Sequence, residues 1–170
     1  MNDEKLCYSI YLQAKRFEDS AELLFKEGNS NPDKFYIPAW CLAAFSLELY
    51  LKSIQQHEKG KFIRTHVIKD IFHELNEESK NKIKTNFKFD LLQIPDLNVN
   101  ELELISGVKI TENFDEVLND ISNLFVEFRY IFDDQNKPKS FVYIESLRKA
   151  ITDRVSELEI DKNPELDGRL

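Results

Sequence analysis

The sequence has little of what makes tight turns or covalent cross-links. Only four glycines, five prolines and two cysteines occur among its 170 residues. This scarcity of glycine and proline favours long helices and argues against folds built from many tight turns. The two cysteines, Cys7 and Cys41, fall within predicted helices and lack the spacing of a metal site. We therefore expect two small buried thiols in a reducing compartment, with no disulfide between them.

Targeting signals are missing as well. We expect no charged-then-apolar leader at the N-terminus. We also expect no apolar run long enough to span a membrane. These absences predict a cytoplasmic protein with no membrane partner. The formal net charge of −8 disfavours nonspecific adhesion to anionic surfaces such as duplex DNA, although it is compatible with a local basic pocket.

Apolar residues, by contrast, are plentiful. They make up 42% of the chain, and thirteen of them are phenylalanine. A chain of this length and composition is expected to form one domain with its own core. Because helical periodicity dominates, we predict an all-α fold, an antiparallel bundle of about five helices over residues 1–160, followed by a flexible tail over residues 161–170.

The boundaries of the predicted helices follow from apolar spacing and from end signals. The expected helices span residues 3–26, 36–58, 66–75, 113–132 and 140–158, with either an extension or a separate turn over 77–87. Residues 29–34 are expected to form a polar loop. Residues 88–110 are expected to form loops, with a short helix over 101–106 as an alternative.

Three polar residues are the expected helix caps. Thr65 precedes the helix over 66–75, and Ser140 precedes the last helix. Asn113 with Glu116 has the spacing of a capping box at the start of the helix over 113–132. Pro38 is expected near the start of the second helix, where its missing N–H group costs little.

The predicted helix over residues 36–58 is apolar on two sides. One face carries a stripe made of Tyr36, Trp40, Ala43, Ala44, Leu47, Leu51 and Ile54. Nearly opposite lie Leu42, Phe45 and Leu49. A helix with two apolar faces either occupies the centre of a bundle or offers its second face to another subunit, so Leu42, Phe45 and Leu49 are a candidate dimer face. Between the stripes, Glu48 and Lys52 are one turn apart in the favourable order for an ion pair.

Three segments together resemble the HEPN family (higher eukaryotes and prokaryotes nucleotide-binding). AAFSLELYLKSI carries two small residues, then Glu48 and Lys52; THVIKDIFHEL begins with His66 after its threonine; and FVEFRYIFDD carries Arg129 and Tyr130. The similarity spans residues 39–133, and it depends on the order and spacing of the segments. It implies an all-α bundle, often a dimer, that binds nucleotides or RNA or serves as the partner of a nucleotidyltransferase-type protein, in settings such as defence or toxin–antitoxin systems.

Many members of that family are metal-independent ribonucleases. They carry an arginine that steadies the scissile phosphate and, a few residues later, a histidine for proton transfer. Arg129 matches the arginine, but the positions expected for the histidine hold Asp134, Gln135 and Asn136. An acid and two amides do not replace an imidazole that titrates near neutrality. We therefore expect a protein without ribonuclease activity.

Two roles remain open for Arg129 and for the tyrosine beside it. Arg129 either forms an ion pair with Asp133 or Glu48 that steadies the bundle, or presents its guanidinium to a phosphate in a groove between subunits. Tyr130 either packs against another helix or subunit, or stacks on a base.

Two further clusters have a functional and a structural interpretation. Four side chains share a sector of the predicted helix after Thr65 and could bind a metal ion, although a solvated face has the same pattern: His66, Asp70, His73 and Glu77. His66 could instead form a hydrogen bond with a neighbouring helix. The loop KGKFIR places Phe62 between cations, a pattern of single-stranded nucleic-acid contacts that is also typical of a solvated loop.

Three hypotheses follow for the function of the chain. The first is a non-catalytic homodimer that binds a nucleotide, RNA or a protein partner through Glu48, Lys52, His66, Arg129, Tyr130 and Asp133. The second is an RNA endonuclease with a displaced histidine, which would use Arg129 with His66 or His73. The third is a structural adaptor that dimerises through its second apolar face. None of the three requires a metal ion or an organic cofactor.

Overall fold

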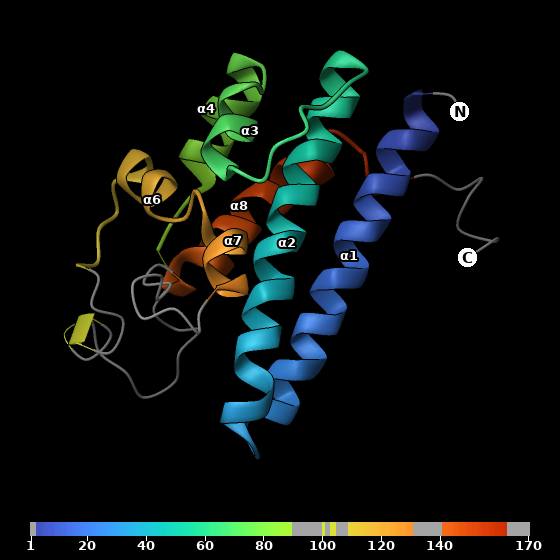
Figure 1. The fold of residues 1–170 in the computed structure, drawn as a ribbon. Helices are drawn as coiled ribbons and strands as arrows, with labels where there is room; N and C mark the ends of the chain where they lie inside the picture. The colour runs from blue at the N-terminus through green and yellow to red at the C-terminus, as the bar shows by residue number, and fades with distance from the viewer. Residues whose placement is uncertain (1–2, 90–99, 101–102, 105–108, 131–140, 163–170) are drawn as a thin grey trace.

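The computed structural model describes residues 3–89, 100, 103–104, 109–130 and 141–162 of the chain. Within these ranges the chain forms helices and no strand, which confirms the predicted all-α fold (Figure 1). The elements are α1 (Asp3–Gly28), α2 (Pro32–Lys59), α3 (Ile68–His73), α4 (Glu77–Asn86), α6 (Phe114–Asp120), α7 (Leu124–Arg129), the 3₁₀ helix η3 (Phe141–Tyr143) and α8 (Ile144–Glu157).

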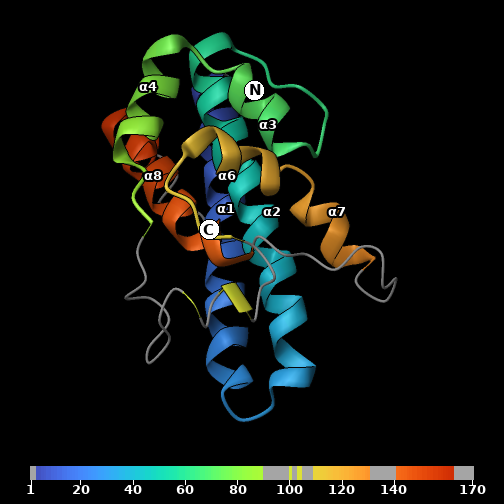
Figure 2. The ribbon, with the colours of Figure 1, turned by 90° about the vertical axis from the view of Figure 1, so that its left-hand side faces the viewer.

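The two longest helices, α1 and α2, form an antiparallel hairpin (Figures 1 and 2). Their connection is shorter than predicted, because α2 begins at Pro32 instead of residue 36. Proline suits the first turn of a helix, where its N–H group has no intrahelical partner. Pro38 consequently lies inside α2, and its predicted place near the helix start is wrong. Gly28 lets the hairpin close, since a Cβ atom there would lie 2.2 Å from the ring of Tyr36.

Helix α2 is the centre of the bundle. It packs against α1, α3, α7 and α8, and Figure 2 places α8 and α7 on opposite sides of it. The main predicted stripe is buried from Ala43 to Ile54. On the second face, Phe45 is half-buried, and its ring lies 4.7 Å from that of Phe17 and 4.8 Å from that of Phe125. Leu42 and Leu49 are half-buried as well. The second face is therefore covered in part by the same chain.

Length and composition alone would allow α2 to cross a membrane, contrary to the expectation that no run of that length exists. However, 61% of its most apolar window is buried by the other helices, as in the core helix of a bundle. The length and apolar composition of α2 are therefore only weak evidence for a membrane span.

The predicted helix over residues 113–132 is two helices, α6 and α7, because the chain leaves the helical path at residues 121–123. At that break, the Ser122 carbonyl accepts a hydrogen bond from the N–H group of Ile68 at 2.9 Å. The Asn113 cap is confirmed, since its side chain accepts from the N–H groups of Asp115 and Glu116. The break sets α7 in contact with α2.

Helix α3 is shorter than predicted. It begins at Ile68, its N-cap is Val67 and not Thr65, and Thr65 Oγ1 instead accepts from the N–H group of Val67 at 3.2 Å. His66 therefore belongs to the connection between α2 and α3. The predicted extension over 77–87 is a separate helix, α4. The last helix, α8, begins at Ile144 after η3, while Ser140 lies outside the described residues.

Buried polar contacts tie the helices together. Glu18 on α1 accepts hydrogen bonds from Tyr50 on α2 and from Arg148 on α8. Burial and the hydrogen bond to Glu18 raise the pKa of Tyr50 above its ordinary value. On the other side of α8, Arg154 donates to Ser79 at 2.8 Å and to Glu78 at 3.0 Å, both on α4. These contacts satisfy polar groups that would otherwise destabilise the core.

Candidate functional site

Three residues of the predicted site lie together where the α2–α3 connection passes α2. Glu48 accepts a hydrogen bond from Lys52 Nζ at 2.7 Å through Oε1 and contacts His66 Nδ1 at 2.9 Å through Oε2. The ion pair follows from the one-turn spacing within α2, and the contact with His66 confirms the interpretation of this histidine as the partner of a neighbouring helix. We call Glu48, Lys52 and His66 the Glu–Lys–His cluster.

The His66 ring is held from several directions. Since a carboxylate only accepts hydrogen bonds, the contact with Glu48 assigns the proton of the neutral ring to Nδ1. The ring centroid of Phe125 on α7 lies 5.4 Å away. Two residues further on, the N–H group of Ile68 binds the Ser122 carbonyl at the α6–α7 break. The contacts that divide the predicted long helix therefore also position His66.

Burial differs sharply within the cluster. The side chain of Glu48 is 1% exposed and that of Lys52 is 9% exposed, whereas that of His66 is 53% exposed. Lys52 compensates the buried charge of Glu48. His66 thus presents an oriented ring to solvent, with Nε2 as the ring nitrogen left available once Nδ1 is bound to Glu48. An oriented, accessible imidazole can bind an anionic ligand when protonated or accept a proton when neutral.

The basic segment KGKFIR forms the connection that carries His66. Gln55, buried on α2, ties both this connection and α3 to α2: it accepts from the N–H group of Ile63 at 3.1 Å and donates to the carbonyl of Ile71, within α3, at 3.1 Å. The Phe62 ring is 36% exposed, and Lys52 Nζ lies 5.9 Å from its centroid. Sequence spacing could not pair Gln55 with this connection, because the contact joins residues that no helical repeat relates.

The predicted site residues near the end of α7 are only partly described. Arg129 is the last residue of α7, one turn after Phe125, but its side chain lies outside the described residues. Asp133 and the positions expected for the nuclease histidine lie outside them as well. Tyr130 follows α7 and is 45% exposed. Neither role of Arg129 is therefore tested.

The four residues of the possible metal site do not form one cluster. His66 lies before α3 and turns to Glu48, while Asp70 and His73 belong to α3 itself. Glu77 lies at the start of α4 and pairs with Lys80, which lowers the pKa of Glu77. Across the part of the chain that the structure describes, no group of three His, Cys, Asp or Glu side chains could hold a metal ion.

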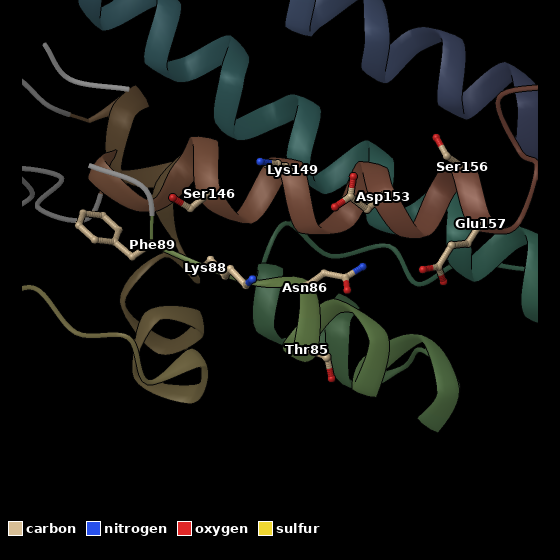
Figure 3. Close-up of a pocket in the computed structure, with 9 residues that line it drawn as sticks. All are labelled: Thr85, Asn86, Lys88, Phe89, Ser146, Lys149, Asp153, Ser156 and Glu157. Carbon is tan, nitrogen blue, oxygen red and sulfur yellow. The ribbon is translucent and has the colours of Figure 1, made fainter. Parts of the chain in front are cut away.

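A hollow of about 980 Å³ lies between the end of α4 and α8 (Figure 3). Lysine, acid, hydroxyl and amide side chains line it, together with one aromatic ring, and they are Thr85, Asn86, Lys88, Phe89, Ser146, Lys149, Asp153, Ser156 and Glu157. The sequence analysis missed this groove; the one signal for it is the spacing of Lys149, Asp153 and Glu157 along one side of α8. Its mixed charges favour no single class of ligand.

Comparison with known proteins adds no relative: no family model, no curated protein and no solved structure matches the chain.

Proposed function

We propose that this protein binds a nucleotide or RNA through its phosphate at the Glu–Lys–His cluster. The observation that carries the proposal is the contact between buried Glu48 and half-exposed His66. The carboxylate of Glu48 holds Nδ1 and leaves Nε2 as the ring nitrogen that can contact a ligand.

Charge around the cluster favours a phosphate over other ligands. Lys61 and Arg64 precede His66 on the same connection, and both are exposed. Arg129 would add a guanidinium from α7, as the family resemblance implies. Guanidinium groups form paired hydrogen bonds with phosphate oxygens. In a chain of net charge −8, this local accumulation of cations supports a specific anionic ligand.

The test is RNA binding by matched histidine variants. A fluorescein-labelled RNA of twelve nucleotides is titrated with the wild type, with His66→Ala and with His73→Ala, and the anisotropy of the dye is followed. We expect His66→Ala to weaken binding about tenfold, the loss of one charge-assisted contact. His73, an exposed histidine on α3, is the control and should leave the affinity unchanged. Equal affinity of the two variants, or no binding by the wild type, would refute the proposal.

Ribonuclease activity is a second candidate, favoured by the same contact, because a carboxylate-oriented imidazole is a suitable general base. Nε2 of His66 would take the proton of a ribose 2′-hydroxyl. The resulting oxygen would form a bond to the adjacent phosphorus, and the bond from phosphorus to the 5′-oxygen would break. The leaving oxygen would take a proton from water, which gives a cyclic phosphate and a 5′-hydroxyl.

Cleavage is measured on end-labelled RNA in the presence of EDTA. Activity that is lost in both His66→Ala and Arg129→Ala, but kept in His73→Ala, would support an endonuclease. Binding without cleavage would support the non-catalytic function, which the absence of the family's own histidine motif favours. A protein that binds no RNA and no nucleotide, but forms a stable dimer, would instead fit the adaptor hypothesis.

A further inference from the structure

We infer that Phe62 is a stacking platform for a base of single-stranded RNA whose phosphate lies at His66. This inference rests on the proposed function and names the ligand class of the same site. The phenylalanines of the core are buried, as Phe72 is at 1% exposure, whereas 36% of Phe62 is accessible. An aromatic ring that remains accessible beside cations matches the composition of single-strand binding surfaces.

The segment that carries Phe62 is anchored. The next residue, Ile63, donates its N–H group to buried Gln55, and Gln55 in turn binds the Ile71 carbonyl. The backbone next to Phe62 is therefore anchored to the core. A preorganised segment loses little conformational entropy when a base stacks on its aromatic ring.

The ring and the imidazole lie beside the same buried pair. Lys52 Nζ is 2.7 Å from Glu48 Oε1 and 5.9 Å from the Phe62 centroid, while Glu48 Oε2 is 2.9 Å from His66. Phe62 and His66 thus both lie beside the Glu48–Lys52 pair, Phe62 next to the lysine and His66 next to the carboxylate. Lys61 and Arg64, exposed on the same connection, can contact the phosphates of neighbouring nucleotides.

A single strand fits this arrangement better than a duplex. Stacking on Phe62 requires an unpaired base with an open face, and the bases of a duplex are already stacked on one another. Stacking is also tolerant of sequence, because every base has a π-face. We therefore expect binding to oligomers of either adenylate or uridylate, with the duplex bound much more weakly.

The experiment compares Phe62→Ala, Phe62→Leu and Phe62→Trp in the anisotropy assay with a labelled twelve-nucleotide RNA. Leucine keeps the apolar contact without a π-face, and tryptophan keeps the π-face. We expect Ala and Leu to weaken binding by at least about fivefold and Trp to retain the wild-type affinity. Leu23→Ala is the surface control and should have no effect. Circular dichroism and melting temperature establish that each variant is folded.

The outcomes separate this inference from the proposed function. If His66→Ala weakens binding but all Phe62 variants bind like the wild type, the stacking inference is wrong and the phosphate site stands. If Leu restores the affinity as well as Trp does, the contact is merely apolar, and the stacking inference is again wrong. Duplex RNA that binds as tightly as the single strand would also overturn it. If the wild type binds no RNA, both proposals fail.

Discussion

At the scale of single residues, Glu48 determines the arrangement of the candidate site. Its pair with Lys52 could be predicted, because the two residues are one turn apart on a helix. Its contact with His66 could be predicted only as a hydrogen bond to an unspecified helix, since the two residues are 18 positions apart and belong to different elements. Periodicity relates residues of one element and carries no information about contacts between elements.

Removing one partner of the buried pair should destabilise the fold more than removing both. Glu48→Leu leaves the Lys52 charge buried without its carboxylate, which we expect to lower the free energy of unfolding by about 3–5 kcal/mol. The double variant Glu48→Leu, Lys52→Met removes both charges and should recover most of that loss. Urea denaturation of the wild type, both single variants and the double variant measures the effect. A double variant no more stable than Glu48→Leu would show that the charge of Lys52 is not destabilising in the absence of the Glu48 carboxylate.

Cys7 gives a prediction for alkaline pH. Burial raises the pKa of its thiol to about 12 from an ordinary value of 9.0, and Sγ donates to the Ser53 carbonyl at 3.2 Å. Since the folded state holds this proton more tightly, its contribution to stability is complete below pH 9 and is lost as the pH rises from about 9 to about 12. The slope for one such group is at most about 1.4 kcal/mol per pH unit.

The measurement is the free energy of unfolding in urea at pH 8 and at pH 10.5, for the wild type and for Cys7→Ala. The wild type should lose more stability between the two pH values than the variant does. The parallel variant Cys41→Ala, at a half-buried position, is the control and should behave like the wild type. Parallel losses in the wild type and Cys7→Ala would contradict the assignment of a tightly held proton to this thiol.

At the scale of elements, the sequence predicts helices well where the apolar stripe is long and continuous. Both α1 and α2 were placed within a few residues of their observed ends. The division of the helix over 113–132 was missed, because its apolar spacing continues through residues 121–123. What divides it is a tertiary hydrogen bond from Ile68 to Ser122, which no local pattern encodes. The start of α3 was misplaced for a local reason: Thr65 Oγ1 accepts from the N–H group of Val67, two residues on, and His66 lies outside the helix.

The connection between α2 and α3 should depend on Gln55 for its order. Replacement by alanine removes both the contact with Ile63 and the contact with Ile71, so the connection should open more often. We expect trypsin to cleave Gln55→Ala after Lys61 and Arg64 at least about fivefold faster than it cleaves the wild type. Mass spectrometry of the first fragments identifies the sites.

Gln13→Ala, on the exposed side of α1, is the matched control for this proteolysis and should be cleaved like the wild type. If the early cleavage sites and rates of Gln55→Ala are those of the wild type, then Gln55 does not fix the connection. In that event, the anchoring of Phe62 would also lose its support.

At the scale of the whole molecule, α2 is a core helix with other helices on several of its sides. The main stripe is buried from Ala43 to Ile54, while Tyr36 and Trp40 at its start are half-buried. The ring of Phe45 packs against those of Phe17 and Phe125, so part of the second face is covered by the same chain. Leu42 and Leu49 are only half-buried, so a second copy could still cover them. Sequence alone could not decide between a central helix and a helix that packs against a second subunit, because both require the same apolar pattern.

The homodimer remains a prediction at this scale. Light scattering should give twice the chain mass of 20.1 kDa for the wild type. Leu49→Glu places a charge on the half-buried face and should give a monomer, because an unpaired charge within an interface is costly. Leu23→Glu, at an exposed position of α1, should remain dimeric. A wild-type protein with the mass of one chain would show that the predicted homodimer is wrong.

The most direct test of the central claim follows the ring nitrogens of the three histidines by ¹H–¹⁵N NMR while single-stranded RNA is added. His66 should show its proton on Nδ1 before any RNA is present, held there by Glu48. Addition of RNA should shift the Nε2 signal of His66 and leave those of His57 and His73 in place. A His66 ring with its proton on Nε2, or signals of His66 that do not move while RNA binds, would contradict the assignment of this cluster as the binding site.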